Sequence, residues 1–211
     1  MKNLVYKELK LSINKFFYIL PLILACLMFI PQWVFTLVFM YFFWITATQI
    51  YSGYLAQEDY SFCSMLPVTR KDIATSKAIS LFVVEGLHLV SGIIIGIIHN
   101  LLYGSMNIFL DINFAFFGII IVMFSLFNIV FLPLYFKTAY FFGKPVIYGV
   151  VVTLVYAFLM EYGVLRFQFM RDIFEGTISN QIIVLVVGIV ITVLLNYIAV
   201  IRSRKNYESI K

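Results

Sequence analysis

The sequence predicts an all-α integral membrane protein with six transmembrane helices. Of its 211 residues, 63% are hydrophobic and only 12% are charged, and the mean hydropathy is +1.02. A chain this apolar cannot cover a soluble globule with a hydrated, charged surface. Its apolar residues also fall into separate runs near the roughly 20 residues that about 30 Å of hydrocarbon requires. Composition and run length therefore define the fold class.

The elements can be assigned in chain order. Residues 1–15 carry four lysines, and apolar residues recur between them at helical spacing, which is typical of a helix lying in the membrane interface. The six predicted spans follow at 16–30, 33–51, 78–99, 114–135, 146–160 and 182–201. Between the last two, the segment 161–181 mixes apolar residues with Arg166, Arg171, Asp172 and Glu175. We expect this extracellular amphipathic segment to lie in, or re-enter, the outer leaflet.

The longest polar interruption in the chain is the 58–80 segment. Leu66-Pro67 should break its backbone, because proline lacks an N–H and restricts the residue before it. Thr69 stands three residues before Asp72, the spacing of a capping box, so a helix should restart there and continue into the third span.

Basic residues orient the chain. With both termini inside, all but two of the 15 lysines and arginines lie on the cytoplasmic side, the exceptions being Arg166 and Arg171. The positive-inside rule therefore predicts cytoplasmic termini and a cytoplasmic 58–80 segment. It also accounts for the net charge of +5 without a nucleic-acid partner.

The third span carries a polar, small-residue stripe at helical spacing, formed by Glu85, His88, Gly92, Gly96 and His99. The two glycines permit close helix approach. Glu85 needs a partner inside the membrane, and His88 is the nearest candidate in sequence. Glu85, His88, Gly92 and Gly96 could line a translocation pathway that contacts substrate or protons. The other interpretation is a hydrogen bond that serves packing.

The sequence lacks the motifs of several kinds of catalytic and nucleotide-binding site. There is no GxxxxGK[ST] loop for ATP, no H-E-x-x-H zinc site and no Gly-x-Ser-x-Gly elbow. Cys26 lies in an apolar span and Cys63 in the polar segment, so neither a disulfide nor a metal site is expected. We therefore expect a non-catalytic protein with no catalytic residues and no directly bound cofactor or metal.

Two stretches carry a family resemblance. The sequence LPVTRKDI at 66–73, followed by Ser76-Lys77, and the sequence LPLYFK at 132–137 resemble motifs of small ABC-2 type ABC-transporter permeases. The chain is also similar to the permeases of staphylococcal exporters of phenol-soluble modulins, which are amphipathic peptides. The resemblance implies a single permease domain over 1–211, a coupling helix in the loop 53–80, and re-entrant helices between the fifth and sixth spans.

The resemblance also implies partners. A cytosolic ABC ATPase subunit, which binds ATP and Mg, would dock on the coupling helix. The residues expected to contact it are Glu58, Asp59, Phe62, Leu66, Pro67, Thr69, Arg70 and Lys71. Six spans are half the usual twelve, so a second permease is expected, as a homodimer or a sister subunit.

The resemblance implies a multi-pass protein of the cell membrane that exports amphipathic peptides or other hydrophobic cargo out of the cell. The aromatic-rich stretch 35–44 would supply an apolar wall to the cavity or face lipid. The composition, rich in Ile, Phe, Lys and Asn, fits a Gram-positive bacterium. The alternative is an intramembrane protease-like or bacteriocin-immunity protein that acts without ATP.

Overall fold

The computed structural model describes residues 2–104 and 107–210, and every regular element within them is helical. The expectations for Met1 and Lys211 lie outside the described residues. The N-terminal half contains α1 (Lys2–Lys7), the π-helical turn η1 (Glu8–Ser12), α2 (Phe16–Ala25), the 3₁₀ turn η2 (Cys26–Phe29), α3 (Phe35–Tyr41), the π-helical stretch η3 (Phe42–Ala47), α4 (Thr48–Ala56) and α5 (Asp59–Ser64). The remaining elements are α6 (Arg70–Tyr103), α7 (Phe114–Lys137), α8 (Gly143–Arg166), α9 (Gln168–Phe174) and α10 (Ile178–Glu208).

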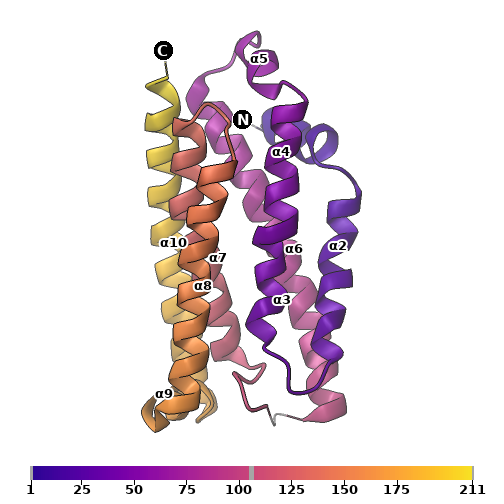
Figure 1. The fold of residues 1–211 in the computed structure, drawn as a ribbon, viewed down its shortest axis with the longest axis vertical. Helices are drawn as coiled ribbons and strands as arrows, with labels where there is room; N and C mark the ends of the chain where they lie inside the picture. The colour runs from indigo at the N-terminus through magenta and orange to yellow at the C-terminus, as the bar shows by residue number, and fades with distance from the viewer. Residues whose placement is uncertain (1, 105–106, 211) are drawn as a thin grey trace.

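Five helices among the described residues are long and apolar enough to cross a membrane: Phe35–Ala56, built from α3, η3 and α4, together with α6, α7, α8 and α10. A sixth crossing is possible if the bent pair Lys2–Ser12 and Phe16–Phe29 counts as one span; its two parts meet at 74°. The all-helical membrane fold is confirmed at this level. The bend makes α1 and η1 cross the end of the bundle while α2 runs along it (Figure 1).

The two ends of the bundle differ in what they carry. Both chain termini and α5 lie at one end, and α9 lies at the other (Figure 1). We call the first the terminal end. The 58–80 segment and the connection between α7 and α8 therefore share an end with the N- and C-terminal helices.

Several helices extend beyond the predicted spans. The side chain of Thr69 accepts a hydrogen bond from the Asp72 backbone N–H at 3.2 Å, which starts α6 well before the predicted residue 78. The hydroxyl of Thr69 also donates to the Asp72 carboxylate at 2.7 Å, in place of the expected return bond to the backbone. Because α8 continues to Arg166 and α10 begins at Ile178, only the middle of the 161–181 segment forms a separate helix, α9.

The core is aromatic and lies between the α3–η3–α4 helix and α7. Phe43 stacks on Phe127 with ring centroids 4.5 Å apart, and Phe127 stacks on Phe131 at 4.9 Å. Both interpretations of the aromatic stretch 35–44 need correction, because Phe35, Phe39, Phe42 and Phe43 are buried inside the chain. These four rings belong to the protein core, whereas Tyr41 and Trp44 of the same stretch are partly exposed.

Backbone atoms of α7 and α10 approach each other closely. A Cβ atom built at Gly188 would lie 2.7 Å from the Gly118 carbonyl oxygen, which is too close for any side chain. The predicted glycine pair on α6 acts differently: a Cβ at Gly92 would meet the ring of Phe39, and one at Gly96 would meet the side chain of Ile112. Those two glycines make room for side chains.

Candidate partner-docking site

The exposed helix α5 forms the tip of the 58–80 segment. It follows Glu58, whose φ of 51° places it in the left-handed region and turns the chain sharply out of α4. After six residues the helix stops ahead of Leu66-Pro67, as the sequence predicts. A short helix held between two breaks is thus presented at the terminal end.

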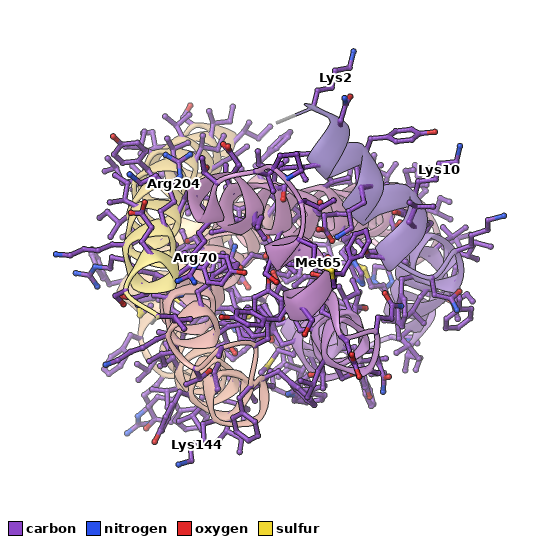
Figure 2. The ribbon with its side chains drawn as sticks, turned by 90° about the horizontal axis from the view of Figure 1, so that it is seen from above. Lys2, Lys10, Met65, Arg70, Lys144 and Arg204 are labelled. Atoms are coloured by element: carbon purple, nitrogen blue, oxygen red, sulfur yellow. The ribbon has the colours of Figure 1, made fainter. Side chains whose placement is uncertain are left out.

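Two large apolar side chains are exposed on α5 and just after it. Phe62 is 49% exposed and Met65 is 78% exposed. Hollows of about 170 and 230 Å³ flank the helix, the first lined in part by Tyr60 and Ser64 and the second in part by Phe62. Viewed onto this end, Met65 lies near the middle of the face, with Lys2, Lys10 and Lys144 toward its edges (Figure 2). Met65 was not among the residues predicted to contact a partner.

The predicted contact residues differ in their accessibility. Glu58, Phe62, Pro67, Thr69, Arg70 and Lys71 are exposed, and Leu66 is half-buried. Asp59 is only 4% exposed, so it cannot form part of a contact surface in this conformation. Its position is explained by a buried cluster of charges beneath α5.

That cluster joins three segments far apart in sequence, and we call it the ion cluster: Lys7, Glu8, Asp59 and Lys77. Asp59 receives the ammonium groups of Lys7 and Lys77, each at 2.6 Å, on its two carboxylate oxygens. Glu8 contacts the same two lysines at 3.0 and 3.4 Å. Two positive and two negative charges therefore alternate around one site.

The ion cluster is shielded from solvent. Glu8 and Lys77 are each 1% exposed, and the Lys77 ammonium lies 3.2 Å from the centroid of the Tyr54 ring, a cation–π contact. Buried charges are tolerated only when they are paired, as these are. Lys7 comes from α1, Glu8 from η1, Asp59 from α5 and Lys77 from α6. The cluster therefore holds the exposed helix α5 against the interfacial helix and against a membrane helix.

The ion pairs stabilise the charged forms of both Asp59 and Lys7. Burial by itself would raise the pKa of Asp59, but the charges of Lys77 and Lys7 outweigh it and hold that pKa below its ordinary value. Burial would likewise lower the pKa of Lys7, but the carboxylates of Asp59 and Glu8 raise it well above its usual range. Asp59 and Lys7 are therefore both charged at neutral pH.

A thiol lies against the cluster. The Cys63 Sγ donates to Asp59 at 3.4 Å and accepts from the Lys7 ammonium at 3.6 Å. Burial, reinforced by the Asp59 carboxylate, raises the pKa of the Cys63 thiol to about 11. The thiol thus stays protonated at neutral pH.

The start of α6 is also held by the C-terminal helix. Arg70 donates to the backbone carbonyls of Tyr207 and Ile210. Lys71 pairs with Glu208 at 3.1 Å, with both side chains about half exposed. These two predicted contact residues therefore brace α6 against α10.

The ion cluster was not predicted from the sequence, although one signal was present. Glu8 is the single acidic residue among the first 15, and it stands beside Lys7 in an otherwise basic helix. Lys77 was assigned only a place in the cytoplasmic charge count. Nothing in linear spacing connects residues 7 and 8 with residues 59 and 77.

The polar stripe of α6 faces the interior of the chain. Glu85, His88, Gly92, Gly96 and His99 are all buried. The expected pairing of Glu85 with His88 needs correction: the carboxylate accepts from Asn128 Nδ2 at 3.1 Å, whereas the His88 ring faces Thr46 and the Val84 carbonyl.

The opposite end of the bundle is closed by another buried carboxylate. Glu161 of α8 accepts from the Thr36 hydroxyl at 2.8 Å and from the Leu110 backbone N–H at 3.1 Å. The Asn113 side chain donates to the Phe174 carbonyl at 3.0 Å, which holds α9 against the start of α7. Phe167 and Phe169, at the start of α9, are exposed.

These features define a class: a multi-span helical membrane protein that presents a rigidly anchored, apolar-tipped helix at the end carrying its termini. The family model described as ABC-2 family transporter protein matches residues 3–208. The chain therefore belongs to the ABC-2 family of transporters. Members of this family are typically non-catalytic membrane subunits that work with an ABC ATPase. No curated protein and no solved structure matches the chain.

Proposed function

We propose that this chain is the permease subunit of an exporter whose separate, cytosolic ABC ATPase docks on α5. The observation that carries the proposal is the combination of an exposed apolar tip and a buried ionic anchor. Phe62 on α5 and Met65 just after it are large, exposed apolar side chains, and a few such anchors can carry most of the binding energy of an interface. Asp59 on the same helix binds the cluster beneath it.

The anchor explains how force would reach the membrane. A docking helix on a flexible loop would move without displacing the spans, because nothing would couple it to them. Here Lys77 of α6 and Lys7 of α1 both hold Asp59. Movement of α5 with the ATPase would therefore pull on the membrane helix α6 and on the interfacial helix α1 together.

The orientation proposed is the one with both termini in the cytoplasm. The basic residues Lys2, Lys10, Arg70, Lys144 and Arg204 all lie on the face viewed in Figure 2. The positive-inside rule assigns such a face to the cytoplasm, where an ATPase would be available. ATP and Mg would then be bound by the ATPase subunit.

The cargo proposed is an amphipathic peptide or another hydrophobic molecule, as in the phenol-soluble modulin exporters of staphylococci, with a Gram-positive source. A second permease, identical or related, would complete the transporter in the membrane. The long apolar faces of α8 and α10 support this, since both expose valines and isoleucines along their length. Such faces fit contact with lipid and with another helical subunit.

A pathway role for Glu85, His88, Gly92 and Gly96 would require helices to part. The four lie against other helices of the same chain, where the ring of Phe39 covers Gly92. If they contact cargo in an open state, Glu85→Gln should reduce export while the complex stays assembled. Normal export by Glu85→Gln would exclude this role.

The docking site is tested by co-purification of the cognate ATPase with Phe62→Asp and Met65→Asp. Both side chains are exposed, so both variants should fold and insert while capturing much less ATPase. Met65→Asp is the cleaner of the two, because the Phe62 ring also lies 5.6 Å from the Lys7 ammonium of the ion cluster. Phe169→Asp is the control matched to Met65→Asp, because Phe169 is 73% exposed and lies at the opposite end. Undiminished capture by both α5 variants would place the ATPase elsewhere.

A further inference from the structure

A further buried carboxylate lies on α6, apart from the ion cluster and from Glu161. Glu85 of α6 is 5% exposed. Its Oε2 accepts from Asn128 Nδ2 of α7 at 3.1 Å, and the same nitrogen donates to Asn196 Oδ1 of α10 at 3.0 Å. These three side chains form a hydrogen-bonded chain across three helices.

No cation among the described residues pairs with Glu85. On α6 itself, His88 is turned away, its ring nitrogens facing Thr46 Oγ1 at 3.4 Å and the Val84 carbonyl at 3.0 Å. On this helix, nothing offsets a negative charge on Glu85.

The facing helices supply neutral groups. The α4 helix contributes Tyr51, and α7 contributes Tyr135, whose ring packs on Tyr51 with centroids 4.6 Å apart. Asn128 of α7 and Asn196 of α10 are uncharged amides. An isolated ionised carboxylate is very costly to bury in such surroundings.

Two acceptor atoms of this group have no hydrogen-bond partner among the described residues: Glu85 Oε1 and Asn128 Oδ1. Both residues are more than nine-tenths buried. An ionised carboxylate and an amide oxygen cannot bond to each other, because neither has a hydrogen to donate. The hydroxyls of Tyr51 and Tyr135 have no partner among the described residues either, so neither donates to these two oxygens in this structure. One proton added to Glu85 supplies the donor. It converts Glu85 to an acid that can donate to an amide oxygen while still accepting from the amide nitrogen.

We propose that Glu85 is a proton-binding site in the membrane core, and that its neutral acid pairs with Asn128 to fasten α6 to α7 and α10. The Glu85 carboxylate takes the proton from solvent as the chain folds, and no other bond changes. If α6 parted from α7, water would reach the carboxyl group and the proton would be released. The site would thus load and unload a proton as these helices close and open.

Infrared spectroscopy of the full-length protein in lipid at neutral pH provides one test. The carbonyl band of a protonated carboxylic acid should be present in the wild type and lost in Glu85→Gln. Glu161→Gln is the control, because each Glu161 oxygen already accepts a hydrogen bond, and it should leave the band unchanged. Asn128→Ala keeps the acid but removes its partner, so it should shift the band. A missing band, a band that survives Glu85→Gln, or one unmoved by Asn128→Ala would overturn the proposal.

The pH dependence of unfolding in mixed micelles gives a second, independent test. The folded state of the wild type holds one proton that the unfolded chain releases above about pH 4.3. Because the proposal has the folded protein keep this proton at neutral pH, the folding equilibrium constant of the wild type relative to Glu85→Gln should fall about tenfold per pH unit from about pH 4.3 to pH 7. A ratio that is independent of pH would overturn the proposal. Neither test uses the ATPase or transport, so both stand apart from the proposed function.

Discussion

Replacing Lys77 by methionine should be among the most destructive single changes outside the helix contacts. Methionine keeps the length of the side chain but removes a positive charge that contacts Asp59 at 2.6 Å and Glu8 at 3.4 Å. The two carboxylates would then share Lys7 alone, and one buried negative charge would have no counterpart. Breaking a buried ion pair in this way costs about 3–5 kcal/mol. Since about 1.4 kcal/mol corresponds to a factor of ten, we expect a loss of roughly two to three and a half orders of magnitude in the unfolding equilibrium.

Lys71→Met is the matched control for this change. Lys71 makes an ion pair of similar length with Glu208, 3.1 Å, but both side chains are about half exposed. Exposed pairs contribute about 0–1 kcal/mol, so the control should change stability little. Combining Lys77→Met with Asp59→Asn restores charge balance and should recover part of the loss. Unfolding in mixed micelles measures all three variants, and equal losses for Lys77→Met and Lys71→Met would refute the reasoning.

Three further outcomes follow from the described contacts. Because the pKa of Asp59 is lowered in the folded protein, the stability that Asp59 contributes is present above its ordinary pKa of 3.8 and is lost as the pH falls through the folded-state pKa. Because the pKa of Lys7 is raised, the stability that Lys7 contributes is present below its ordinary pKa of 10.5 and is lost as the pH rises through the folded-state pKa. In unfolding curves, the advantage over Asp59→Asn should thus stay constant from about pH 5 to 9 and shrink below about pH 4. The Cys63 thiol should react with iodoacetamide roughly two orders of magnitude more slowly than a free cysteine, because its pKa of about 11 leaves little thiolate at pH 7. A reaction rate like that of a free cysteine would mean that α5 is detached from the ion cluster. Gly188→Val should lower the melting temperature sharply, because its side chain would strike the Gly118 carbonyl, and an unchanged melting temperature would show that α7 and α10 do not touch there.

Local features of the fold could be predicted from the sequence. Runs of apolar residues identified the membrane helices, because burial in lipid demands length and hydrophobicity alone. The start of α6 at Thr69 followed from its spacing to Asp72. The break at Leu66-Pro67 followed from proline chemistry.

The contacts that define the sites could not be predicted, because they depend on packing between distant segments. Asp59 was expected on the docking surface, yet the bend between α1 and α2 brings Lys7 and Glu8 across the bundle end and draws Asp59 inward. Glu85 was expected to pair with His88, which stands three positions further along the same helix, because sequence spacing predicts only contacts within one helix. Its actual partner, Asn128, comes from another helix.

The most direct measurement of ATPase docking through α5 is site-specific photo-crosslinking in membranes. A photoreactive side chain at position 65, where Met65 is 78% exposed, should form a covalent adduct with the cognate ATPase. The same side chain at position 169, where Phe169 is 73% exposed at the other end, should form none. An adduct from position 169, or none from position 65 in a functioning transporter, would contradict docking through α5.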